Sequence, residues 1–393
     1  MFETVIVGGG IHGTLLQLAI LRQDGSLPVV IDPEPEPLAV WKRVTTACGM
    51  RYLRSSSSHN LELDVHALRR FARKRGYGES HFIQPHMRPS LELFNAHADY
   101  LVDRHGLGER VRDEVVEIAP ESPGFLLRGA AQSYRARRVI LAPGMPPPVV
   151  PWPEEDVDEP SRALHIFDPR FTLDGIGPAD TVGIVGCGVT GGQLAITLRG
   201  RGVREVTIFD IAEPTEADYD GNPCYVGPKC GDAFEKLARP EERRREITLQ
   251  RYPGTLPREI YAELSALRNS GALRFEKGRV THLRHSGDQI ELELIGKGSS
   301  SPRLYAFDRV VAATGFAAIP PVADLIAPLA DSQGLPRGPE GYPVPDETLQ
   351  WMPELYVAGA LGELRIGPPA RNIIGAHLTA RRILPSLQGA SVA

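Results

Sequence analysis

The sequence predicts an α/β protein made of two similar units, each built around a parallel sheet. Residues 5–7 form a short β-branched run, a glycine turn follows at 8–13, and residues 14–20 are apolar at helical spacing. The same order of strand, glycine turn and helix recurs over residues 182–196. In each unit the next strand ends in an aspartate, 24 residues after the first glycine of the turn. Two complete copies of one pattern are a stronger indication than either copy alone.

The first turn has the features of a dinucleotide site. In the pattern G-x-G-x-x-G, Gly8 permits a tight turn, Gly10 lets the backbone approach a pyrophosphate, and Gly13 lets the helix pack on the strand. The helix N-terminus offers N–H groups and partial positive charge to the phosphates. A carboxylate at Asp32 can accept from both ribose hydroxyls. We therefore predict that these residues, with His12 inside the turn, bind one dinucleotide.

The second turn repeats the same chemistry. Gly186, Gly188 and Gly191 have the same spacing, and the strand over 206–209 ends at Asp210. A second dinucleotide facing the first is the prediction. The alternative is a vestigial site in which Asp210 merely ends a strand.

Composition excludes several classes of function. The chain has 393 residues, 42% of them hydrophobic and 24% charged, as in globular proteins of two or three domains. Its net charge of −5 gives no basic field for nucleic acid, and the basic run 69–75 is interpreted as a solvated helix face. No apolar run approaches the roughly 20 residues that span a bilayer, and the N-terminus enters a strand without a signal pattern. We expect a cytoplasmic protein with no nucleic-acid or membrane partner.

The cysteines and histidines predict neither a redox dithiol nor a metal site. Cys48, Cys187, Cys224 and Cys230 contain no C-x-x-C pair, and we interpret them as free thiols, although Cys224 and Cys230 are near enough in sequence to approach each other. The histidines show no metal-ligand spacing, so we expect no metal.

The remaining segments alternate between helix and strand patterns. Apolar periodicity predicts helices over 65–75, 90–104 and 373–384, the last preceded by a Gly-Pro-Pro turn. It also predicts strands over 115–118 and 125–127 in a small sheet, and further strands over 138–141 and 291–294. Residues 309–316 are expected to form a buried strand that ends in a turn, and residues 355–359 the last strand. The proline-rich stretch 145–153 is expected to be a linker. The excursion 213–252 shows no clear strand pattern and is interpreted as a functional loop or lid.

Several of these features together carry a family resemblance. The two glycine turns, the strand end Ala312–Ala313–Thr314–Gly315–Phe316 and the closing segment at Gly359 resemble the two-dinucleotide-binding flavoproteins. Within that group the chain is similar to flavin-containing and N-hydroxylating (lysine/ornithine-type) monooxygenases over nearly its whole length. The resemblance implies an FAD-binding domain at 1–150 and 310–393, and an NAD(P)-binding domain at 160–308. It adds Thr314, Gly315, Gly359 and Asn372 to the expected cofactor contacts.

The resemblance also suggests candidates for catalysis. The loop over 50–60 is expected to cross the flavin, with His59 and Asn60 giving polar contacts. His165 has the spacing of a fingerprint histidine of Baeyer–Villiger and flavin-containing monooxygenases, but the F-x-G before it is missing. Gly359 is followed by alanine where the wider group has aspartate. The motifs themselves require no catalytic acid or base, so His59, Asn60 and His165 stay candidates for catalysis.

The expected function is an enzyme that reduces FAD with NAD(P)H and passes the electrons to oxygen and a small amine or sulfur nucleophile. A flavin reductase or dehydrogenase without oxygen insertion is the first alternative, and a non-enzymatic redox sensor is the second. The missing C-x-x-C argues against the disulfide reductases of this fold. Monooxygenases of this type usually prefer NADPH, but the carboxylate of Asp210 suits the free 2′-hydroxyl of NADH, which is the cofactor we predict.

Overall fold

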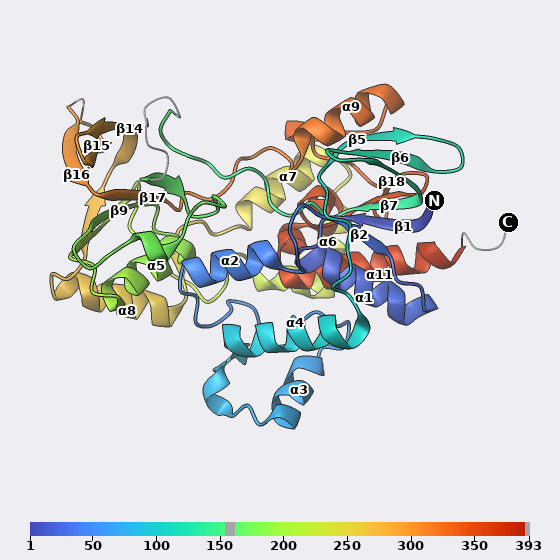
Figure 1. The fold of residues 1–393 in the computed structure, drawn as a ribbon, viewed down its shortest axis with the longest axis horizontal. Helices are drawn as coiled ribbons and strands as arrows, with labels where there is room; N and C mark the ends of the chain where they lie inside the picture. The colour runs from blue at the N-terminus through green and yellow to red at the C-terminus, as the bar shows by residue number, and fades with distance from the viewer. Residues whose placement is uncertain (154–161, 300, 390–393) are drawn as a thin grey trace.

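The computed structural model describes residues 1–153, 162–299 and 301–389, and it shows two lobes, each with its own parallel sheet (Figure 1). The expected start of the second domain, at residue 160, lies outside the described residues. No helix within these ranges is long and apolar enough to cross a membrane.

The sheet of the first lobe has seven strands. Four of them run parallel in the order β19-β7-β1-β2, and β18 pairs with the outer edge of β19. The predicted strands near 115 and 125 do not form a separate small sheet, because the β5–β6 hairpin pairs with β7 and extends this sheet. The strands are β1 (Phe2–Val7), β2 (Val29–Ile31), β5 (Val115–Pro120), β6 (Phe125–Gly129), β7 (Ser133–Leu141), β18 (Gln350–Met352) and β19 (Leu355–Val357).

Both faces of the parallel strands are covered, so these strands are buried (Figure 1). One face packs against α1 (Ile11–Asp24), α4 (Leu91–His105) and α11 (Ile373–Gly389), through residues such as Leu15, Phe94 and Ile383. The other face shares a core with the β5–β6 hairpin and with α9 (Ala323–Gln333), which contacts β5. The predicted helix at 65–75 is α3 (Ala67–Arg75), and its arginines are exposed as expected.

The second lobe repeats the parallel core. Its sheet has the order β13-β10-β9-β17-β8, with all neighbours parallel. Helices α5 (Val189–Gly200) and α8 (Arg258–Asn269) cover one face, and an antiparallel sheet of three strands covers the other. The strands are β8 (Ala163–His165), β9 (Thr181–Val185), β10 (Glu205–Asp210), β13 (Arg274–Lys277), β14 (Arg279–Ser286), β15 (Gln289–Ile295), β16 (Arg303–Phe307) and β17 (Arg309–Ala312). Strand β17 lies inside this second sheet, between β9 and β8.

The excursion 213–252 is largely helical. It contains the two-residue strand β11 (Thr215–Glu216), the short turn η4 (Pro223–Val226), and helices α6 (Pro228–Glu235) and α7 (Pro240–Leu249). The prediction that its cysteines are free thiols is wrong, because Cys224 and Cys230 form a disulfide. Turn η4 and the first turn of α6 fold the segment back and bring the two Cα atoms to 5.5 Å, within disulfide range. Cys48 and Cys187 are free and buried.

Candidate functional site

The first glycine turn joins β1 to α1 and leaves space for a ligand. Gly8 has φ +105°, and a Cβ there would collide with the carbonyl oxygen of Ala142 at the end of β7. A Cβ at Gly13 would collide with the carbonyl oxygen of Gly8. A Cβ at Gly10 would meet nothing within 4 Å, although Gly10 is the residue that caps α1. The protein's own packing thus requires glycine at 8 and 13, whereas the space over Gly10 is open at a helix N-terminus, as a diphosphate needs.

Asp32 lies beside this turn and contacts its backbone. It follows β2, and its carboxylate accepts hydrogen bonds from the backbone N–H of Gly9 at 2.5 Å and of Glu34 at 2.7 Å. These two amides orient the carboxylate beside the turn. A carboxylate fixed at this place has lone pairs left for two ribose hydroxyls.

The second turn reproduces this arrangement. Gly186 has φ +103°, and a Cβ there would lie 2.6 Å from the carbonyl oxygen of Ala313, just after β17. A Cβ at Gly191 would collide with the Gly186 carbonyl, whereas a Cβ at Gly188 would meet nothing within 4 Å. Asp210 accepts from the N–H of Cys187 at 2.5 Å. The structure therefore brings the predicted residues of each turn together in the same way twice.

The C-terminal segment meets the first turn through His12. The His12 Nε2 atom lies 3.0 Å from the Ala370 carbonyl oxygen, and a Cβ on Gly359 would lie 3.6 Å from the His12 ring. Burial lowers the pKa of His12 to about 4, so the neutral ring donates from Nε2 to Ala370. Ala370 belongs to the short turn η7 (Pro368–Arg371), and Asn372, the first residue after this turn, precedes α11. Gly359 and Ala370 therefore lie against His12 in the first turn, whereas the Asn372 side chain donates to Asp220 of the excursion at 3.5 Å.

Two further predicted contacts lie elsewhere. Thr314 and Gly315 follow the carboxyl end of β17, where the Thr314 hydroxyl donates to the carbonyl oxygen of Val149. Gly315 has φ +81°, and its carbonyl accepts from the N–H of Val149 at 3.0 Å. These residues fasten the connection between the lobes beside the second turn.

The loop over 50–60 contains one polar group that has no partner. The Nδ1 atom of His59 is buried and unbonded, and burial lowers the pKa of His59 to about 4. His377, on α11, was not predicted; its Nε2 atom donates to the Asn60 carbonyl oxygen at 2.6 Å, and its buried Nδ1 atom has no partner. Burial also lowers the pKa of His377. Two neutral imidazoles thus present unbonded nitrogens near the C-terminal helix.

The other two catalytic candidates, Asn60 and His165, are buried and hydrogen-bonded within the protein. The Asn60 side chain is fully buried, and it donates to the Asp64 carbonyl and accepts from the Glu62 N–H, so both its amide groups already have partners. His165 is buried at the end of β8, and its Nδ1 atom accepts from the N–H of Phe167 at 3.1 Å. Burial lowers the pKa of His165 to about 4, and its Nε2 atom is buried without a partner.

A buried ion cluster joins the excursion to the C-terminal segment. Glu363 has no exposed surface, and its carboxylate pairs with Arg244 of α7, with Arg251 at 2.5 Å and with Arg371 of η7 at 2.8 Å. Burial alone would raise the pKa of Glu363, but the arginines outweigh burial and hold that pKa below its usual range. Helix α7 is thereby held against the turn that precedes α11.

Sequence reasoning also missed two arginines beside the turns. Arg110 lies against Gly9 in the first turn, and all three of its guanidinium nitrogens are buried without a hydrogen-bond partner. Arg268 of α8 lies near the second turn, where it pairs with Glu213 at 2.8 Å. Neither arginine belongs to a local sequence motif. Arg110 comes to the first turn because the next residue, Val111, pairs with Ile31 of β2.

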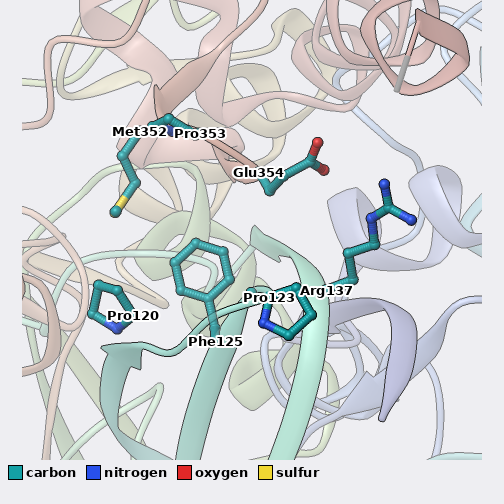
Figure 2. Close-up of a pocket in the computed structure, with 8 residues that line it drawn as sticks. Pro120, Pro123, Phe125, Arg137, Met352, Pro353 and Glu354 are labelled. Atoms are coloured by element: carbon teal, nitrogen blue, oxygen red, sulfur yellow. The ribbon is translucent and has the colours of Figure 1, made fainter. Parts of the chain in front are cut away.

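Two pockets on the described part of the surface lie away from both turns. One, of about 290 Å³, lies where the β5–β6 hairpin meets the β18–β19 hairpin, and Figure 2 shows Phe125 between Pro120, Met352 and Pro123. The other, of about 310 Å³, is lined by His66 and arginines of α3. No predicted site residue lines either pocket.

Comparison with solved structures finds proteins that share this fold over almost the whole chain. The ornithine N-hydroxylase of Kutzneria sp. 744, described with reduced FAD, NADP⁺ and L-ornithine, matches with a TM-score of 0.79 at 16% identity over 99% of each chain. The L-lysine 6-monooxygenase of Pseudomonas syringae matches with a TM-score of 0.75 at 19% identity over the whole of both chains. The bacillithiol disulfide reductase of Bacillus cereus matches with a TM-score of 0.63 at 16% identity over 99% of each chain.

These similarities at low identity establish the fold predicted from the sequence. No protein-family model matches the chain, and no curated protein matches its sequence. The assignment of chemistry therefore depends on the residues of the two turns.

Proposed function

We propose that the protein is an FAD-dependent NAD(P)H oxidoreductase that acts as a monooxygenase on a small amine. The observation that carries this proposal is the duplicated turn, in which Gly10 and Gly188 face open space and Asp32 and Asp210 are fixed by the same backbone contact. Two such sites suit one flavin and one nicotinamide dinucleotide. The amine substrate class is supported by the hydroxylases of ornithine and lysine that share the fold.

The residues of the first turn fit FAD. When bound, FAD supplies hydride acceptance and oxygen chemistry, and the protein supplies binding and orientation. The space over Gly10 would hold the diphosphate, and Asp32 would hold the adenosine ribose. His12 fixes Ala370, and thereby the approach to α11, whose N-terminus would lie beside the flavin. The unbonded Nδ1 atom of His377 is an acceptor for an N–H or O–H group of the ligand.

The second site favours NADH over NADPH. Asp210 ends β10, and Glu213 adds a second carboxylate nearby. The Asp210 carboxylate would repel a 2′-phosphate, which carries nearly two negative charges. Arg268 is the opposing feature, but its guanidinium is already paired with Glu213. The NADP⁺ described with the Kutzneria enzyme makes the comparison of both cofactors necessary.

The experiment is direct. Purified protein should be yellow and contain about one FAD per chain, NADH should reduce that flavin faster than NADPH, and oxygen uptake should rise when a primary amine is added. Colourless protein that binds no added FAD would contradict the proposal. Oxygen uptake that no amine, thiol or ketone alters would remove the monooxygenase part and leave an NAD(P)H oxidase or reductase.

A reductase without oxygen insertion is the second candidate. The observation in its favour is the Cys224–Cys230 disulfide, together with a bacillithiol disulfide reductase that has the same fold. The pair is not in C-x-x-C spacing, yet it gives the chain a group that two electrons can reduce.

Cytoplasmic location, expected from the sequence, stays a prediction.

A further inference from the structure

Arg110 lies in a position that is unfavourable for a protein without a ligand. It follows α4 and directly precedes Val111, whose N–H donates to Val30 of β2 at 2.8 Å and whose carbonyl accepts from Asp32. This extended residue places Arg110 at the edge of the first sheet, next to the predicted ribose carboxylate. A Cβ on Gly9 would collide with the Nη1 atom of Arg110 and lie 3.1 Å from its central carbon. The guanidinium therefore lies against the middle residue of the glycine turn.

The guanidinium has no hydrogen-bond acceptor in the protein. Its Nε, Nη1 and Nη2 atoms are all buried, and none of them is hydrogen-bonded. The Asp32 carboxylate is close enough to act electrostatically, but it accepts from the amides of Gly9 and Glu34 instead. Burial lowers the pKa of Arg110, and only the charges of Asp32 and Glu36 oppose that effect. A buried cation whose donors are all unbonded is costly, since each lost hydrogen bond to water goes uncompensated.

We propose that Arg110 binds the adenosine diphosphate half of FAD, with its guanidinium donating to the diphosphate and ribose oxygens. This inference rests on the proposed function, because it assigns FAD to the first turn. Three observations converge: contact with the glycine turn, proximity to the ribose carboxylate, and a planar fork of donors without partners. A guanidinium matches the geometry of phosphate oxygens and binds them in bidentate fashion. Bound FAD would supply the acceptors that the protein lacks.

The proposal predicts opposite effects of one substitution on the apoprotein and on the complex. Arg110→Met keeps most of the side chain's length and removes the charge. Without FAD, the midpoint of thermal unfolding should stay the same or rise, because an unpaired buried cation is gone. FAD should bind about 10- to 100-fold more weakly, as expected for losing charge-assisted hydrogen bonds. Arg110→Lys keeps the charge but not the planar fork of donors, so its FAD affinity should lie between those of the wild type and Arg110→Met.

The ligand's own parts then locate the contact. ADP, used as a competitor of FAD rebinding, reports on the first site alone, and Arg110→Met should weaken ADP by the same factor as FAD. FMN lacks the adenosine half, so its weak binding should be unchanged. Arg104→Met, at an exposed arginine near the end of α4, is the matched control and should leave all of these values unchanged.

Each contrary result has a clear meaning. Unchanged FAD affinity in Arg110→Met would overturn the assignment while leaving the proposed function intact. A fall in apoprotein stability in step with the loss of FAD would show a structural role instead, and weakened FAD with unchanged ADP would move the contact to the riboflavin half. Wild-type protein that binds no FAD would refute the proposed function, and this inference with it.

Discussion

Substitution of Gly10 by alanine separates binding of the cofactor from folding of the turn. Gly10 has φ −74°, which alanine adopts readily, and its Cβ would meet nothing within 4 Å. The free energy of unfolding of the apoprotein should therefore stay the same or rise by about 0.4–1 kcal/mol. The methyl group would instead occupy the approach path of a diphosphate. Overpacking of this kind costs about 1–3 kcal/mol, or roughly a 5- to 150-fold loss in FAD affinity.

The assay is flavin occupancy after purification, followed by titration of apoprotein with FAD and thermal unfolding without FAD. Gly13→Ala is the contrasting variant, because its Cβ would lie 3.0 Å from the Gly8 carbonyl carbon and collide with the oxygen, so stability itself should fall. Gly78→Ala, at another open position with φ −83°, is the neutral control. Full FAD affinity in Gly10→Ala would refute the placement of the diphosphate over this turn.

Three further predictions follow from other parts of the structure. Glu363→Gln should lower the free energy of unfolding by about 3–5 kcal/mol, because the arginines around it lose a buried charged partner. Since the pKa of Glu363 in the folded protein lies below its usual range, the stability advantage of the wild type should be present above about pH 4.3 and disappear as the pH falls through the folded pKa. Denaturant titrations at a series of pH values would measure this difference. Asp210→Arg should shift the preference for flavin reduction towards NADPH in stopped-flow experiments, and an unchanged preference would show that the hydride donor does not contact Asp210. Anaerobic reductive titration should consume two electrons per FAD if the Cys224–Cys230 disulfide is only structural, and Cys224→Ser should then leave that number unchanged; four electrons in the wild type would favour the reductase.

Local patterns in the sequence predicted the fold and the two turns well. Each glycine turn is a contiguous sequence motif. Glycine is required at 8 because a Cβ would collide with the Ala142 carbonyl after β7, and at 13 because a Cβ would collide with the Gly8 carbonyl. The strands and helices around them follow from apolar periodicity. The sequence predicts both strands of the β5–β6 hairpin but puts them in a separate small sheet, because it gives their apolar pattern and not their partner, β7.

The groups that sequence missed depend on contacts between distant parts of the chain. Arg110 becomes notable only because Val111 pairs beside β2 and thereby brings its neighbour to Gly9. The Glu363 cluster likewise joins α7 to η7, which no spacing in the sequence indicates. The disulfide differs: the sequence shows that Cys224 and Cys230 are close enough to approach each other, but nothing in it indicates the turn η4 that brings them together.

The most direct test of the proposed activity is the fate of molecular oxygen. The protein would be incubated with NADH, isotopically labelled O₂ and a panel of primary amines, thiols and ketones, and the products examined by mass spectrometry. A monooxygenase of amines should yield a product that has gained one labelled oxygen atom, in proportion to the NADH consumed. Steady consumption of NADH with no labelled oxygen in any product would contradict the monooxygenase assignment.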